Sequence, residues 1–231
     1  SPREFVKEVE DFSWTRHVWR IDLHDTPEVA HASYDGLPSI DLLAKLDMTT
    51  RGLRATVTYK YAGGFLGADS NYTKSSLELS QYWPLRWKLV GHIRGSIAYG
   101  DSFGDTPNLP VQERFFLGGI NTIRGFRNFT ISPTDPAGGD GLTGGNKAFF
   151  IQNEILFPLY DPLKMRGVVF CDLGNAFDER SGFEWSVKRS VGVGLRFTSP
   201  LGAIRLDWGF NLAPAPNEKL QVLHFSAGAA F

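Results

Sequence analysis

The sequence predicts an all-β fold, a transmembrane antiparallel β-barrel, and three observations support this prediction. Apolar and polar residues alternate with a period of two, which gives each strand one apolar and one polar face. The alternating runs cover about nine to eleven residues, the length of a tilted membrane-spanning strand, whereas soluble strands usually cover about five or six. The segments between the runs are alternately short and long, as in outer-membrane barrels.

Composition and charge exclude several classes of protein. The chain has 24 basic and 25 acidic residues, whereas a nucleic-acid binder needs a clear basic excess, so we expect no nucleic-acid partner. The single cysteine cannot form an internal disulfide, a thiol–zinc cluster or a redox pair. No run approaches the roughly 18 apolar residues of a membrane-spanning helix. The 13% aromatic content and the 25 glycines favour one all-β unit that is rich in turns.

The clearest alternation lies towards the C-terminal end. Every even position from Ile204 to Leu212 is apolar, and every odd position between them is polar or glycine. In the last strand, the odd positions Leu223, Phe225 and Phe231 are apolar and lie opposite a polar face. The alternation extends backwards along most of the chain. The expected strands cover residues 220–231, 203–212, 187–198, 166–176, 147–157, 87–99, 72–83, 53–61, 40–48 and 14–24, with a weakly marked one near 3–10.

The connections between these strands predict a topology. The short ones are 199–202, 158–164, 84–86 and 49–52, and the long ones are 213–219, 177–186, 100–146, 62–71 and 25–39. If the C-terminal strand ends at the periplasmic side, every short turn lies on that side, as outer-membrane barrels require. Since a closed bacterial barrel normally has an even number of strands, a count of ten or eleven predicts either one poorly marked strand or an incomplete barrel.

The connection 100–146 is the longest, and long ordered loops are usually functional. Its first half, from Phe115 to Phe126, is largely apolar. A loop that faces only water would not carry such residues, and the barrel interior is the nearest surface that they can cover. The pair Gly118-Gly119 allows a sharp reversal of the chain. We therefore expect this loop to fold inward.

An inward fold carries Arg124 into the lumen, where a guanidinium needs a carboxylate. By strand parity, Glu154 and Asp172 face the lumen on adjacent strands, and Arg124 can bond to either of them. Phe170 and Gly174 lie on the same lumen wall by the same parity. The alternative is that the loop is only a plug that stiffens the barrel, since buried ion pairs more often fix a conformation than carry out chemistry.

Two motifs carry a resemblance to a known family. The loop contains Gly118-Gly119 followed by Ile123-Arg124-Gly125-Phe126, and a later strand contains Phe170-Cys171-Asp172-Leu173-Gly174. These sequences resemble the (V/I)RG(F/Y) loop motif and the FxDxG strand motif of the BamA-type outer-membrane assembly barrels. Residues 192–207 are similar to that family's penultimate hairpin, and residues 225–231 resemble its last strand. The resemblance covers roughly residues 50–231.

The resemblance implies that the protein assembles and inserts β-barrel proteins into the bacterial outer membrane. In this family the first and last strands pair weakly, open laterally and template incoming strands, which agrees with the tendency of an unpaired edge to recruit another strand. Leu223, Phe225, Gly228 and Phe231 would belong to this gate strand. The implied partners are the lipid bilayer, unfolded β-barrel clients and accessory assembly lipoproteins. A simpler interpretation of Phe231 is the terminal aromatic of any outer-membrane barrel.

The resemblance also predicts the domain organisation. The family barrel has sixteen strands and follows periplasmic POTRA domains, but nothing in residues 1–40 resembles a POTRA fold. We therefore expect residues 1–231 to form one outer-membrane β-barrel domain without a POTRA domain. The chain would be the C-terminal portion or a shortened relative of such a protein. Because it begins Ser1-Pro2 without a methionine, we expect a mature product or an excised piece.

Other functions stay open at this point. The five histidines have no metal-ligand spacing such as H-E-x-x-H, and we expect no enzyme, no metal site and no cofactor. Glu154 and Asp172 could be an acid–base pair, but a counter-ion role for Arg124 is simpler. A passive channel is an alternative because several expected lumen residues are basic, although a porin constriction loop would be charged. These basic residues are Lys60, Lys88, Arg94, Arg196 and Arg205. A two-partner-type secretion transporter is the third alternative.

Overall fold

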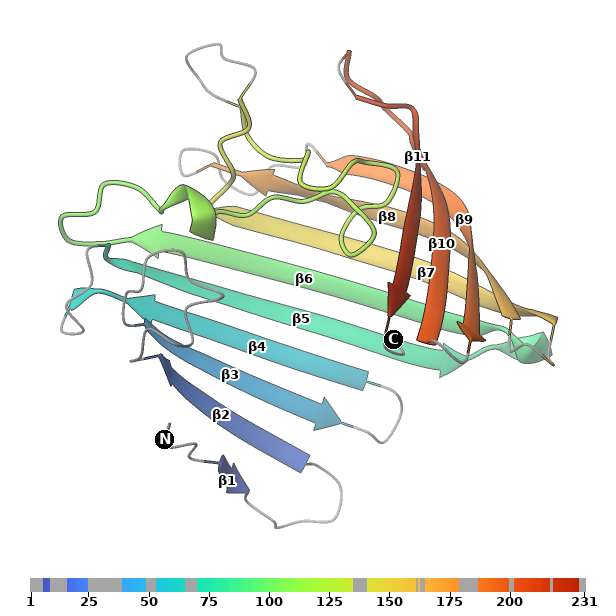
Figure 1. The fold of residues 1–231 in the computed structure, drawn as a ribbon, viewed down its shortest axis with the longest axis horizontal. Helices are drawn as coiled ribbons and strands as arrows, with labels where there is room; N and C mark the ends of the chain where they lie inside the picture. The colour runs from blue at the N-terminus through green and yellow to red at the C-terminus, as the bar shows by residue number, and fades with distance from the viewer. Residues whose placement is uncertain are drawn as a thin grey trace.

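The computed structural model describes residues 6–8, 16–24, 39–48, 53–64, 70–134, 141–160, 162, 165–178, 187–199, 202–216 and 218–228. Within these residues, eleven antiparallel strands form one sheet in which neighbours in sequence are neighbours in space (Figure 1). The strands are β1 Val6–Glu8, β2 Arg16–His24, β3 Ser39–Met48, β4 Leu53–Ala62, β5 Tyr72–Pro84, β6 Val90–Ser102, β7 Lys147–Tyr160, β8 Met165–Phe177, β9 Lys188–Ser199, β10 Gly202–Asn211 and β11 Gln221–Gly228. The predicted all-β fold class is confirmed.

Most strand bounds agree with the predicted ones to within a few residues, but β6 begins later than expected. Residues Arg86–Lys88 form the short 3₁₀ turn η3, in which Trp87 and Lys88 both have φ of 58°. Because this left-handed backbone cannot continue a strand, β6 starts only at Val90. Lys88 is therefore exposed in a turn and does not line the lumen, in contrast to the sequence-based expectation.

The connections alternate as predicted. Short turns join β3 to β4, β5 to β6, β7 to β8 and β9 to β10, and longer segments join the remaining neighbours from β2 onward. The longest segment joins β6 to β7, and its residues 115–131 lie against the concave face of the curved sheet (Figure 1). The assignment of the short turns to the periplasmic side stays a prediction.

The two faces of the sheet differ in the way that a membrane barrel requires. Along β7 the even residues from Ala148 to Glu154 are buried, while the odd residues between them are less buried. The outer face carries exposed large apolar side chains, including Val169, Ile155 and Trp208. Such an outward apolar band fits contact with lipid. Among the described residues, no helix is long and apolar enough to cross a bilayer.

The sheet is open rather than closed in the part of the chain that the structure describes. β1 pairs with β2, β11 pairs with β10, and these two terminal strands do not pair with each other. The strands therefore form a partial barrel wall that curves around the long loop (Figure 1). This arrangement confirms the predicted fold, an outer-membrane barrel that is partial relative to the sixteen-stranded family barrel.

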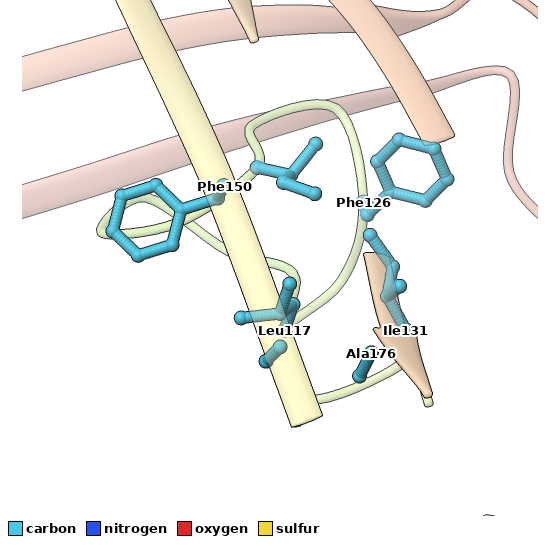
Figure 2. Packing of buried hydrophobic residues seen from close by; sticks show 7 residues of the cluster. Leu117, Phe126, Ile131, Phe150 and Ala176 are labelled. Atoms are coloured by element: carbon cyan, nitrogen blue, oxygen red, sulfur yellow. The ribbon is translucent and has the colours of Figure 1, made fainter. Parts of the chain in front are cut away.

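An apolar cluster attaches the loop to this wall. Leu117, Ile123, Phe126 and Ile131 of the loop pack with Ala148 and Phe150 of β7 and Ala176 of β8. Figure 2 shows the loop side chains gathered beside Phe150 and Ala176. Burial of large apolar side chains is the main favourable term in such packing, at about 1.5–3 kcal/mol each. The apolar half of the loop is thus accounted for by its contact with the inner face of the sheet.

Candidate functional site

The loop forms an irregular hairpin between Leu117 and Ile131, with a glycine turn at its start. Leu117 and Ile131 exchange two backbone hydrogen bonds, each with an N···O distance of 2.9 Å. Gly118 and Gly119 have φ of +101° and +104°, a left-handed conformation that glycine adopts without steric cost. The backbone N–H of Gly119 donates to the carbonyl of Ile123 at 3.0 Å. This turn presents the next residues, 123–126, to the sheet, and all four are buried.

Arg124 is fully buried, with 0% of its surface exposed, and it forms a fork with Asp172. Its Nε donates to Oδ2 of Asp172 at 2.6 Å, and its Nη2 donates to Oδ1 at 2.5 Å. The backbone N–H of Arg124 also donates to Oδ2, at 3.0 Å. Two parallel charge-assisted bonds fix the orientation of the guanidinium as well as its position.

The same guanidinium reaches two further strands. Its Nη1 donates to Oε1 of Glu154 on β7 and, at 3.4 Å, to Oδ2 of Asp207 on β10. Its centre lies 3.6 Å from the ring centroid of Phe170, which adds a cation–π contact. The structure therefore brings Arg124 to Glu154 and Asp172 at once, and it adds Asp207, which the sequence analysis did not select.

Two more arginines complete the cluster. Arg196 of β9 donates to Glu154 at 3.0 Å and also bonds to Asp207, while Arg205 of β10 donates from Nε to Asp207 at 2.7 Å. Three guanidinium groups thus face three carboxylates in the lumen. We call this set the lumen cluster; its members are Arg124, Arg196, Arg205, Glu154, Asp172 and Asp207. Because its formal charges balance, removal of any member leaves an uncompensated charge in a water-poor site.

Glycines on the wall allow the loop backbone to approach the strands. A Cβ on Gly209 of β10 would lie 2.4 Å from the backbone nitrogen of Gly125, which is closer than real Cβ contacts. Gly125 has φ of +85°, and a Cβ there would lie 3.1 Å from the carbonyl carbon of Gly209. The two glycines are therefore needed at one contact between the loop and β10. On β8, a Cβ on Gly174 would lie 2.3 Å from the carbonyl oxygen of Phe149, so Gly174 permits the close pairing with β7.

The last described strand turns two of its predicted gate residues outward and its histidine inward. Leu223 and Phe225 are 62% and 67% exposed and point outward. Gly228 pairs with Ala203 of β10, and Phe231 lies outside the described residues. His224 points inward, where its Nε2 accepts a hydrogen bond from the backbone N–H of Gly125 at 3.1 Å.

A second anchor holds the start of the loop. Glu113, in the short 3₁₀ turn η4 (Val111–Glu113), accepts hydrogen bonds from Lys60 at 2.6 Å and from Tyr72 at 3.0 Å. Lys74 lies 3.4 Å from its other carboxylate oxygen. Burial opposes ionisation of Glu113, but the hydrogen bond and charge of Lys60, the charge of Lys74 and the hydrogen bond from Tyr72 together outweigh it and hold the pKa of the carboxyl below its usual value.

Several residues of the site were missed in the sequence although their strand parity was visible. The alternation that places Arg205 on the polar face also places Asp207 and Gly209 there, and the alternation of the last strand turns His224 inward. Parity does not show which lumen residues the loop reaches, so no local signal identified them. Among the described residues, no group of three or more His, Cys, Asp or Glu side chains is arranged to hold a metal ion.

Comparisons with known proteins agree with this geometry. A family model described as the Omp85 superfamily domain matches residues 39–231. The chain is 33% identical over 188 residues to the outer membrane protein assembly factor BamA of Nitratidesulfovibrio vulgaris, which covers 80% of this chain and 23% of that protein. The crystal structure of BamA from Haemophilus ducreyi lacking POTRA domains 1–3 is similar with a TM-score of 0.68 and 20% identity, over 82% of this chain and 42% of that chain. CdiB from Acinetobacter baumannii has a TM-score of 0.59 and 15% identity, over 95% of this chain and 40% of that chain.

These similarities identify the family and the compartment. At their low identities the two solved structures show likeness of fold alone. The chain spans about a quarter of the length of the bacterial relatives it matches. The predicted location in the bacterial outer membrane and the predicted BamA-type barrel family are confirmed. The chain belongs to the Omp85 superfamily.

Proposed function

We propose that this chain assembles and inserts β-barrel proteins into the bacterial outer membrane through the edge of its last strand. The observation that carries this proposal is the position of β11. It ends the sheet, and in the described part of the chain it pairs on one side only, with β10. An unpaired row of backbone N–H and C=O groups recruits another strand. The similarity to a protein named an outer membrane protein assembly factor supports the same function.

The lumen cluster would keep the wall beside this edge rigid. Arg124 of the loop binds carboxylates on β7, β8 and β10. If β11 exchanges its partner for a client strand, the neighbouring strands must keep their register so that the edge stays a usable template. Five residues of the loop would dock it on the strands: Gly118, Gly119, Ile123, Gly125 and Phe126. Phe170 and Gly174 would form part of the β8 surface that receives the loop.

The proposed function needs no catalytic group. Each carboxylate of the lumen cluster accepts hydrogen bonds from at least one guanidinium, which suits a structural counter-ion better than an acid or base. We further propose the bilayer, unfolded β-barrel clients and accessory assembly lipoproteins as partners. Residues 1–231 would act as one barrel domain, the C-terminal portion of such a protein.

Secretion of a dedicated partner protein is the second candidate. The chain shares its fold with CdiB over 95% of its length, and this likeness does not separate secretion from insertion. A passive channel is a weaker candidate, because the long loop occupies the concave face with buried apolar side chains from Leu117 to Ile131. The candidates differ in what the protein moves. An insertase moves a client strand into the bilayer, a secretion transporter moves a polypeptide across it, and a passive channel conducts ions.

The test is client folding in liposomes. The folding rate of a small unfolded outer-membrane barrel would be measured with vesicles that contain the chain, with vesicles that contain its Arg124→Ala variant, and with empty vesicles. The proposal expects the chain to accelerate folding, and it expects Arg124→Ala to weaken this effect while strand content is retained. Ion conductance without acceleration would favour the passive channel, and acceleration that Arg124→Ala leaves unchanged would remove the loop from the mechanism.

A further inference from the structure

We propose that His224 is a positioning residue that latches β11 to the lumen loop, and that protonation of its imidazole releases this latch. The proposal rests on the proposed lateral opening at β11 and adds a residue and a trigger to it. It concerns a single hydrogen bond between the last described strand and the loop, which joins the edge of the sheet to the lumen cluster.

The position of His224 differs from that of its neighbours. It is 7% exposed, and among residues 221–227 it is the one whose side chain is buried. Its register partner on β10 is Asp207, a member of the lumen cluster. Its Nε2 lies 3.1 Å from the backbone nitrogen of Gly125, the residue that follows Arg124. The bond therefore ties β11 to the part of the loop that the cluster holds most firmly.

The bond requires a neutral imidazole. A backbone N–H can only donate, so Nε2 must accept and the ring proton must reside on Nδ1. Protonation places N–H groups on both ring nitrogens and turns the acceptor into a donor. The N–H of Gly125 then faces another N–H, and it loses its partner at a buried position, which is unfavourable.

The charges around the ring decide what protonation does next. Asp207 on β10 attracts an imidazolium, whereas Arg124 of the loop and Arg205 of β10 repel it. The lumen cluster is already balanced, so an added positive charge has no unassigned carboxylate within it. Protonation therefore separates the loop from β11 and leaves that strand held by its backbone ladder to β10. The latch is closed at neutral pH and opens as the pH falls through the range in which this histidine titrates.

The test is hydrogen–deuterium exchange of the chain in detergent micelles at pH 8 and pH 5, corrected for the intrinsic pH dependence of exchange. In the wild type, amides of residues 120–128 and 221–228 should lose about tenfold in protection at pH 5, because one hydrogen bond contributes about that factor. His224→Gln supplies a carboxamide oxygen close to the Nε2 position and should keep its protection at both values of pH. His224→Leu should show, at both pH 8 and pH 5, the low protection that is expected of the wild type at pH 5.

His92 provides the matched control. Like His224 it is 7% exposed, and it contacts Glu154 and Ser80 rather than the loop. His92→Gln should therefore keep the pH response of β11. The proposal is overturned if wild type and His224→Gln respond equally to pH.

A second measurement needs no variant at position 224. In ¹⁵N-histidine NMR spectra of the wild type at pH 8, a proton on Nε2 of His224 would overturn the latch. Exchange that behaves as expected while client folding shows no acceleration would support the latch and count against the insertion function.

Discussion

The long loop is held at two places that differ in burial. At the inner anchor, Arg124 binds Glu154, Asp172 and Asp207, and the side chain of the arginine is fully buried. This site excludes water, so a charge that loses its partner cannot be solvated. The inner anchor therefore determines where the loop docks.

The outer anchor has similar chemistry in a wetter place. Glu113 binds Lys60, Lys74 and Tyr72 near the loop-bearing end of β4 and β5, where the charged side chains are 18–27% exposed. Ion pairs at such positions are screened by water and salt and contribute little to stability. The loop therefore uses similar contacts for two purposes: the three buried ion pairs of Arg124 fix its position, whereas the two partly exposed ion pairs of Glu113 hold it weakly.

The largest effect is expected from Arg124→Ala. The substitution leaves the lumen cluster with two cations and three anions, and breaking a buried pair in this way costs about 3–5 kcal/mol. We expect this loss in the free energy of unfolding, measured by urea titration in detergent micelles with tryptophan fluorescence. Strand content by circular dichroism should be retained at low urea concentrations.

Arg94→Ala is the control for loss of an arginine as such. Arg94 pairs with Glu78, which is partly exposed, and also donates to the loop carbonyl of Asn121 at 2.9 Å. Its removal should cost clearly less than that of Arg124. Equal losses would mean that burial does not distinguish the inner anchor.

The second effect tests the fit of the inner anchor without changing charge. Gly209→Ala places a methyl group 2.4 Å from the backbone nitrogen of Gly125, so the loop backbone has to move. Overpacking of this kind costs about 1–3 kcal/mol. We expect faster tryptic cleavage after Arg127, which is exposed in the loop. Gly141→Ala, where an added Cβ meets nothing within 4 Å, should leave the cleavage rate unchanged.

The fold was largely predictable because its signal is local and repeated. Period-two alternation located the ten strands from β2 to β11, while β1 was only weakly marked, and connection lengths placed the loops alternately. The clear error, at the start of β6, arose because Trp87 is apolar like a strand residue but has a left-handed backbone. Backbone conformation at a turn depends on the closure of the hairpin, which residue alternation does not encode.

The site was predictable only in part. Apolar residues in a long connection predicted an inward loop, and parity placed Glu154 and Asp172 on the wall where the structure has them. Asp207 and His224 were equally visible by parity, but their contacts with the loop join residues 83 and 99 positions apart. Contacts over such separations follow from the curvature of the sheet and the depth of the loop, and neither has a local sequence signal.

A smaller effect is expected at the outer anchor. Glu113→Gln keeps the shape of the side chain but removes its charge, so the contacts with Lys60 and Lys74 weaken. The expected loss is about 0.2–1 kcal/mol, the range of partly exposed ion pairs. Tryptic cleavage after Arg114 should become faster, while cleavage after Arg127 stays unchanged. A loss as large as that of Arg124→Ala would show that the two anchors are energetically equivalent.

The smallest effect is the pH dependence of the outer anchor. The pKa of Glu113 is lower in the folded protein than in the unfolded chain, because Lys60, Lys74 and Tyr72 together outweigh the opposing effect of burial. The unfolded chain then binds more protons, so the stabilisation is complete above the ordinary glutamate pKa of about 4.3 and is lost as the pH falls through the folded value. At pH 7 the wild type should therefore be cleaved after Arg114 more slowly than Glu113→Gln, and at pH 3 this difference should disappear. The cleavage rates are measured with an acid-tolerant protease whose activity has been calibrated at both pH values. High salt at pH 7 should reduce the same difference. If the wild type is still cleaved more slowly than Glu113→Gln at pH 3, the outer anchor is stabilised by the packing of η4 rather than by its charges.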